Sequence, residues 1–216
     1  MVSNRYRTFN YHIEKVGDLI QIISLNGVTP LVRLTDHNWS SVKRVMDAGA
    51  GGIIIPNITT SEQVVRAINS TRYPPEGTRG VGLARAQNYG ESFHEYLEWQ
   101  KQGPIVIAQI ENIDSIANLD SIFGTKGLDG FMIGPYDLSC SMGIPGDFMN
   151  KNFIKAVDEI LFKGKKYGLS IGTHVVEPDL NLLQQKISQG FNFIAYSVDI
   201  RMLSVTARQA RKVLKK

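Results

Sequence analysis

The chain has 216 residues, of which 43% are hydrophobic, and its formal net charge at pH 7 is +4. This length and composition suffice for one hydrophobic core, so we interpret residues 1–216 as a single domain. The lone cysteine, Cys140, excludes an internal disulfide and a metal site built from several thiolates.

The charge pattern and the hydropathy pattern also narrow the possible partners. Basic residues cluster only at 207–216, which is too local for a nucleic-acid-binding face. No apolar run approaches the ~20 residues of a membrane span. The N-terminal residues lack the apolar core of a signal peptide. We therefore expect a cytoplasmic protein that binds neither nucleic acid nor membrane.

Short apolar runs rich in valine and isoleucine alternate with segments of helical period. The runs predict six strands, at 29–35, 51–57, 104–112, 130–135, 169–174 and 191–199. The intervening pattern predicts helices at 12–27, 40–50, 60–70, 112–123, 150–166, 178–188 and 200–215. Thr59 and Glu62 form the capping box expected to open the third of these helices. All runs but the last lack clean alternation, which is typical of a parallel sheet buried on both faces.

Six strands joined by helices fit either a doubly wound sheet or a (β/α)8 TIM barrel. The glycine-rich loop of nucleotide-binding doubly wound sheets does not follow the first predicted strand, which favours the barrel. A barrel of eight units needs roughly 250 residues, about one unit more than this chain has. Since one helix alone precedes the first predicted strand, the barrel reading implies that its first one or two strands are missing.

Polar side chains lie where the predicted strands end, which is the catalytic face of a barrel. The strand ends supply five such residues: Arg33, Glu111, Asp137, His174 and Asp199. Gln109 precedes Glu111 by two residues and therefore lies on the same side of its strand. Carboxylates from neighbouring strands suit a hard divalent cation, although each acid also has the right place to cap the following helix.

Other chemistries have no support in the sequence. No lysine lies in the predicted strands or at their carboxyl ends, which disfavours a Schiff-base aldolase. There is no Gly-x-Ser-x-Gly elbow and no cysteine–histidine pairing for acyl transfer. The loop at 72–90 is dense in glycine, proline and arginine, and is either functional or a packed surface excursion.

Five stretches in order resemble the metal-dependent class II pyruvate aldolases of the HpcH/HpaI group: LVRLTDHNW, VMDAGAGGIIIPN, RYPPEGTRGVGLARAQNYG, IAQIEN and GLDGFMIGPYDLSCSMG. The resemblance runs from about residue 10 to the C-terminus. It implies a TIM barrel of the pyruvate-aldolase type. It also implies cleavage of a 4-hydroxy-2-oxo acid to pyruvate and an aldehyde, through a pyruvate enolate bound to Mg²⁺ or Mn²⁺. Members assemble as homo-oligomers, trimers of dimers in the best-known cases.

The resemblance assigns roles to residues at the strand ends. Glu111 and Asp137 match the two metal ligands. Arg33 matches the arginine that stabilises the enolate oxygen. Gln109, Asp137 and the backbone at Tyr136 match substrate-contacting positions. These roles agree with the chemistry, because a divalent ion acts as an electron sink and a guanidinium offsets the developing enolate charge.

The chain departs from the family at the acid/base histidine. Family spacing puts that histidine at Thr8, and His12 and His37 are candidate substitutes. Asp47 matches an acid that in the family polarises this histidine. The alternative interpretation is that Asp47 is an ordinary carboxylate at the end of a helix. Two further histidines are interpreted as structural or exposed: His94 and His174.

Two other functions are kept as alternatives. One is a catalytically impaired barrel that binds 2-oxo acids or serves as an assembly subunit. The other is a CoA-ester lyase of the citrate-lyase type. The stretches GPYDLS and RGVG match the aldolases better than they match this class of lyase. If no base replaces the histidine, decarboxylation of oxaloacetate is expected to exceed aldol cleavage, because it needs no deprotonated hydroxyl. The aldehyde half of the substrate cannot be deduced from these motifs.

Overall fold

The computed structural model describes residues 13–214, and the predictions that concern Thr8 and His12 fall outside this range. Its strands are all parallel and pair in chain order: β1 (Leu31–Arg33), β2 (Gly52–Ile55), β3 (Ile105–Ile110), β4 (Gly130–Ile133), β5 (Ser170–Val175) and β6 (Phe193–Tyr196). Each strand coincides with one of the six predicted runs, which confirms the parallel sheet.

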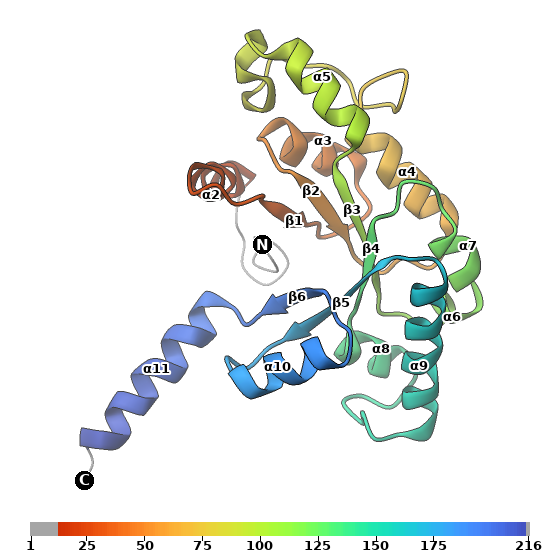
Figure 1. Ribbon diagram of the computed structural model, residues 1–216, viewed down its shortest axis with the longest axis vertical. Helices are drawn as coiled ribbons and strands as arrows, with labels where there is room; N and C mark the ends of the chain where they lie inside the picture. Colours follow the sequence, from red (N-terminus) through yellow and green to blue (C-terminus); the bar gives the residue numbers. More distant parts are fainter. Residues whose placement is uncertain (1–12, 215–216) are drawn as a thin grey trace.

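Helices and one 3-10 segment join the strands along the outer side of the curled sheet (Figure 1). In chain order they are α2 (Ile13–Leu25), α3 (Trp39–Asp47), α4 (Ser61–Thr71), η1 (Arg85–Gly90), α5 (Phe93–Gln102), α6 (Asp114–Ala117), α7 (Leu119–Phe123), α8 (Pro135–Ser141), α9 (Lys151–Lys166), α10 (Leu180–Ser188) and α11 (Asp199–Leu214). Among the helices of residues 13–214, none is both long enough and apolar enough to cross a membrane.

The sheet has two apolar faces with different coverings. The larger cluster joins strand residues such as Ile53 and Val106 to helix residues such as Val42 and Ile160. The smaller cluster holds strand residues alone: Ile54, Ile107, Met132 and Ala195, with Phe193 against them. The helices thus pack on the convex face, and the concave face is filled by the strands' own side chains.

The sheet is curled into half of a barrel, which is consistent with a partial TIM barrel (Figure 1). A doubly wound sheet reverses its strand order at a switch point and has helices on both faces. Here the order runs from β1 to β6 without reversal, and the helices share one face. The doubly wound alternative is therefore excluded. The expectation that strands are missing before β1 stays a prediction.

Two local expectations need correction. The predicted helix at 112–123 is two short helices, α6 and α7, which meet at Asn118. The Asn118 side chain donates to the carbonyl of Thr59 at 2.9 Å, which holds the chain at the break. The capping box lies one residue later than predicted, because Gln63 Oε1 accepts the backbone N–H groups of Thr59 at 2.7 Å and Thr60 at 3.1 Å.

Helices α5 and α8 were not predicted. In α5 the buried residues are Tyr96 and Gln100, and Phe93, Tyr96 and Leu97 are spaced as on one face of a helix, a signal that was available in the sequence. α8 begins at Pro135 directly after β4, and proline is favoured in the first turn because its missing N–H has no helical partner there. α8 therefore presents its first turn at the carboxyl end of the strand.

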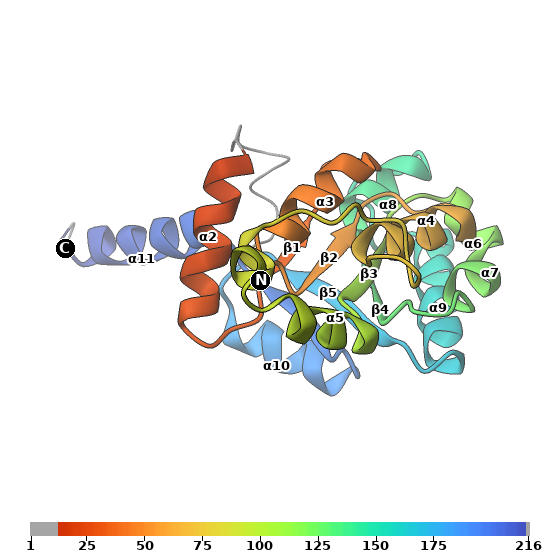
Figure 2. The same ribbon diagram turned by 90° about the horizontal axis from the view of Figure 1, so that it is seen from above.

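The last helix, α11, extends away from the rest of the fold in both views (Figures 1 and 2). At its base the Arg201 guanidinium pairs with Glu177, with a shortest distance of 2.6 Å between Nη2 and Oε2. Ile200 and Leu203 are 48% and 72% exposed. Apolar side chains on a projecting helix indicate a surface that a partner can cover.

Candidate functional site

The carboxyl ends of β3, β4 and β5 meet on the concave side of the sheet. Gln109 of β3 pairs with Met132 of β4, which pairs with Gly172 of β5. Two residues further along the three strands, the register puts three positions at one level: Glu111, Gly134 and His174. Side chains of β1 and β3 complete this edge, because parallel strands end on the same side.

Arg33, Gln109 and Glu111 form a buried polar cluster. Arg33 Nε donates to Gln109 Oε1 at 3.0 Å, and Gln109 Nε2 donates to Glu111 Oε2 at 2.6 Å. Arg33 Nη2 lies 3.5 Å from Glu111 Oε1, which also accepts the backbone N–H of Asn57 at 2.8 Å. The three side chains are between 3% and 9% exposed. Because a buried carboxylate is costly without partners, the contacts with the guanidinium and the amide hold Glu111 in place.

Gly134 makes room beside this cluster. A Cβ atom at this position would lie 2.8 Å from both Cβ and Oε2 of Glu111, and 3.1 Å from Gln109 Nε2. Only glycine fits without displacing the acid. The space in front of it is a cavity of about 330 Å³, lined by Arg33, Gln109, Met132, Ile133, Gly134, Pro135, Tyr136, Asp137, His174 and Val176.

Asp137 and Tyr136 reach the cavity from the first turn of α8. Asp137 is exposed and lies within the helix, two residues after its first residue Pro135, so it does not cap the helix from outside. Tyr136 is 61% exposed, and its ring packs edge-on against Phe148 with the centroids 5.0 Å apart. The tyrosine therefore forms part of the cavity wall at the solvent side.

The donor set around the cavity fits a hard divalent cation. Glu111 and Asp137 offer carboxylate oxygens, which Mg²⁺ and Mn²⁺ prefer. Within residues 13–214 there is no group of three or more His, Cys, Asp and Glu side chains suited to a metal. Asp137 lines the open cavity, and Glu111 lies buried directly behind Gly134. Two carboxylates match an ion that keeps positions for water and substrate, and do not match a closed zinc site.

His174 also lines the cavity, and its interpretation as a structural or exposed residue stays a prediction. Its ring is half-buried, and Nε2 lies 3.4 Å from the backbone carbonyl of Ser197. Burial lowers the pKa of His174 below its ordinary value of 6.5, against a smaller opposing effect of that carbonyl. Ser197 has a left-handed backbone, with φ of 54°.

The other described histidines lie elsewhere. His37 Nε2 is 2.7 Å from the carbonyl of Pro56, and its ring stacks on Trp39. His94 is exposed on α5. Neither residue lines the cavity.

Asp47 is not part of this cluster. It is the last residue of α3, and β2 begins soon afterwards at Gly52, so Asp47 lies on the side where the strands begin. Its Oδ2 is 2.6 Å from Lys43 Nζ, and its Oδ1 is 3.9 Å from Arg79 Nε. The structure shows Asp47 as a helix-end carboxylate in an ion-pair network, and its role in polarising a histidine stays a prediction.

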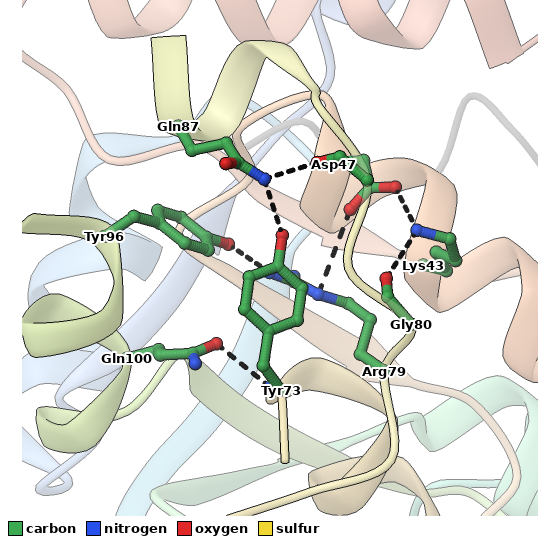
Figure 3. A network of polar contacts seen from close by, with 9 residues as sticks. Lys43, Asp47, Tyr73, Arg79, Gly80, Gln87, Tyr96 and Gln100 are labelled. Atoms are coloured by element: carbon green, nitrogen blue, oxygen red, sulfur yellow. Dashed lines mark hydrogen bonds and ion pairs between the residues drawn. The ribbon is translucent and has the colours of Figure 1, made fainter. Parts of the chain in front are cut away.

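The network around Asp47 is centred on the buried Arg79 (Figure 3). Arg79 Nη2 donates to the Tyr96 hydroxyl at 2.6 Å, and the guanidinium lies 4.2 Å from the Tyr73 ring centroid. Gln87 donates to the Tyr73 hydroxyl at 3.2 Å. Burial raises the pKa of Tyr96 above 10.0, while Arg79 opposes the shift. The arginine-rich loop of the sequence is thus a packed structure around aromatic rings.

Asp199, the remaining polar residue from the predicted strand ends, is the first residue of α11. Its Oδ1 accepts the backbone N–H of Ile200 at 2.7 Å. It lies beyond the end of β6 and is not among the residues lining the cavity.

A curled parallel sheet with a buried arginine, an amide and an acid at its carboxyl edge has the architecture of a barrel enzyme. The sequence profile of the HpcH/HpaI aldolase/citrate lyase family matches residues 11–205. The chain belongs to this family.

Individual relatives agree with this assignment. The chain is 32% identical over 194 residues to a 2-keto-3-deoxy-L-rhamnonate aldolase of Salmonella gallinarum, covering 89% of this chain and 71% of the relative. The structure of a HpcH/HpaI aldolase/citrate lyase family protein from Burkholderia cenocepacia superposes with a TM-score of 0.87 at 29% identity, covering 95% of this chain and 81% of the other. A HpcH/HpaI aldolase from Desulfitobacterium hafniense shares the fold, with a TM-score of 0.84 at 24% identity and coverage of 95% and 80%. These relatives support an aldolase-type lyase.

Proposed function

We propose that this chain cleaves a 4-hydroxy-2-oxo acid to pyruvate and an aldehyde through the enolate of pyruvate, with Mg²⁺ or Mn²⁺ as cofactor. The observation that carries the proposal is the buried cluster of Arg33, Gln109 and Glu111, which opens over Gly134 into a cavity that Asp137 also lines. The similarity to 2-keto-3-deoxy-L-rhamnonate aldolases supports a sugar-acid substrate.

Glu111 and Asp137 would hold the divalent ion. When bound, such an ion supplies Lewis-acid stabilisation of the negative charge that develops on the 2-oxo group. Glu111 is anchored by Gln109 and by the backbone of Asn57, so one ligand is fixed before any ion arrives. Preorganisation of this kind is expected to favour tight and specific binding of the ion.

Arg33 would stabilise the enolate directly. Its guanidinium is 4% exposed, and charges act more strongly in such a low-dielectric setting than in water. Gln109 fixes the orientation of the guanidinium, because its Oε1 accepts a hydrogen bond from Arg33 Nε at 3.0 Å. Gln109 and the backbone at Tyr136 would contact the pyruvate moiety.

The experiment is an assay of pyruvate release from a panel of 4-hydroxy-2-oxo acids, with Mg²⁺ or Mn²⁺ and after chelation. The expected result is metal-dependent release by the parent and by the control Glu98→Gln, whose side chain is 71% exposed. Glu111→Gln should lose the activity because it loses the anionic ligand. Pyruvate release that is equal with and without metal, or equal in Glu111→Gln, would contradict the proposal.

We also infer that the chain is a homo-oligomer. The projecting helix α11 and its exposed Ile200 and Leu203 support this inference, as does the trimer-of-dimers assembly implied by the family resemblance (Figures 1 and 2). Light scattering of the parent should give a mass above one chain. A monodisperse monomer at micromolar concentration would contradict it.

A further inference from the structure

Aldol cleavage needs a group that takes the proton from the C4 hydroxyl of the substrate, and such a base contributes typically ~10² to 10⁴-fold. Residues 13–214 contain three histidines: His37, His94 and His174. Of these, only His174 lines the cavity that holds Arg33 and Asp137. The contact of His37 with the Pro56 carbonyl and the exposure of His94 leave these two rings outside it.

His174 and Glu111 lie on either side of Gly134 on the concave face of the sheet. By strand register Glu111, Gly134 and His174 lie at one level of the concave face, on three neighbouring strands. Since Gly134 has no side chain, the space above it separates the carboxylate from the imidazole. A substrate placed over Gly134 would therefore have the Arg33–Glu111 side at one end and His174 at the other.

The contacts of His174 orient the ring for this task. A carbonyl oxygen can only accept a hydrogen bond, so the long contact of 3.4 Å to Ser197 is satisfied when Nε2 carries the proton. The other nitrogen, Nδ1, then keeps its lone pair. Ser197 is itself held by its N–H to the Val175 carbonyl at 2.7 Å and by its hydroxyl to the Val176 carbonyl at 2.9 Å. Burial lowers the pKa of His174 below its ordinary value, which favours the neutral ring.

We propose that His174 is a catalytic residue that accepts the C4-hydroxyl proton during cleavage, an inference that rests on the proposed function. The O–H bond breaks and its proton passes to Nδ1, while the C4–O bond becomes the carbonyl of the aldehyde. The C3–C4 bond breaks and its electron pair forms the enolate of pyruvate. The imidazolium then returns its proton to C3, directly or through a water molecule that passes a proton on, which gives pyruvate and restores the neutral ring.

Oxaloacetate supplies the control reaction. Its decarboxylation passes through the same pyruvate enolate but loses CO₂, so no hydroxyl proton has to be removed. A base role for His174 therefore predicts unequal losses in the two reactions. A merely structural role predicts equal losses.

The experiment compares cleavage of the best 4-hydroxy-2-oxo acid with decarboxylation of oxaloacetate in three variants of the full chain: His174→Gln, His174→Ala and the control His94→Gln. We expect cleavage to fall by about 10² to 10⁴-fold in both His174 variants. Decarboxylation should stay within about threefold of the parent, which also reports that the variants fold. Added imidazole should restore part of the cleavage in His174→Ala, and His94→Gln should match the parent in both reactions.

The outcomes separate this role from the function on which it rests. Cleavage that persists in the His174 variants, or a parallel loss of both reactions without imidazole rescue, overturns the role of His174 and leaves the proposed function intact. A parent that turns over neither compound with Mg²⁺ or Mn²⁺ overturns both.

Discussion

Two regions of this molecule contain a buried arginine next to an acid, and they differ in what surrounds the pair. Beside Arg33 and Glu111, Gly134 leaves space that opens into a cavity. Around Arg79, the rings of Tyr73 and Tyr96 fill the space, and the guanidinium stacks on them (Figure 3). Buried charge is therefore not by itself a sign of catalysis.

The difference lies in access to the charged groups. In the first region the arginine borders the cavity that Asp137 and His174 also line, so a ligand can reach it. In the second, Arg79 Nε and Nη1 lack hydrogen-bond acceptors and its side chain is fully buried. A buried group that no ligand can reach has no direct contact with a substrate.

In the comparison of these two regions, the largest expected effect is on turnover, from Arg33→Ala. Removing a preorganised group that stabilises developing charge lowers turnover by roughly 10² to 10³-fold. Both aldol cleavage and oxaloacetate decarboxylation should fall, because both pass through the enolate. The measurement is the rate per folded molecule, since Arg33→Ala also removes a partner of the buried Glu111.

Arg79→Ala should lower the stability of the fold and leave turnover per folded molecule unchanged. Arg79→Ala removes the buried hydrogen bond to the Tyr96 hydroxyl and the stacking on Tyr73, which together contribute roughly 1 to 3 kcal/mol to the free energy of unfolding. Denaturant unfolding measures this loss, and turnover per folded molecule should stay near that of the parent. An Arg79→Ala protein that is as stable as the parent but inactive would reverse the assignment of the two regions.

Gly134→Ala tests the space in the first region. Its new Cβ would approach Glu111 Oε2 to 2.8 Å and force the acid to move. Misplacement of about 1 Å can cost roughly 10²-fold in rate. Gly80→Ala is the matched control in the second region, because a Cβ at Gly80 meets no atom within 4 Å. Equal activity of the two alanine variants would show that the space over Gly134 is not needed.

The smallest effect is expected at an exposed ion cluster that serves as a third point of comparison. Lys166 and Lys163 lie 3.0 Å from Asp120 and lower the pKa of that carboxyl from 3.8 to about 2. Because the pKa is lower in the folded state, the contribution to stability is present above pH 3.8 and is lost as pH falls to about 2.

Asp120→Asn should therefore lower the melting temperature slightly at pH 6, and the difference from the parent should shrink between pH 4 and pH 2. Salt should reduce the effect, since the cluster is in contact with water. A difference that grows on acidification would contradict the pKa shift.

The sequence predicted those features that depend on one strand at a time. Runs such as 105–110 are apolar on both faces, and this composition of the strands predicted a parallel sheet. Arg33, Gln109 and Glu111 were found together because parallel strands end at one edge, and the structure brings them within hydrogen-bond distance.

The features that the sequence missed depend on relations between segments. The sequence placed His174 at a strand end, but its position level with Glu111, with Gly134 between them, follows from the register of β3, β4 and β5, which no single strand reveals. A glycine before Pro135 was the available signal, but glycine marks turns as often as ligand sites. Asp47 matched a motif, yet it is the last residue of α3 and therefore lies at the end of the sheet where the strands begin, away from the cavity.

Titration of Mn²⁺ into the protein by calorimetry tests the central claim most directly, because the claim is that Glu111 and Asp137 form a metal site at the carboxyl edge of the sheet. The account predicts binding by the parent and by Glu98→Gln with equal affinity. It predicts at least about tenfold weaker binding by Glu111→Gln, because one anionic oxygen ligand is replaced by a neutral amide. Equal affinity of Glu111→Gln and the parent would contradict the account.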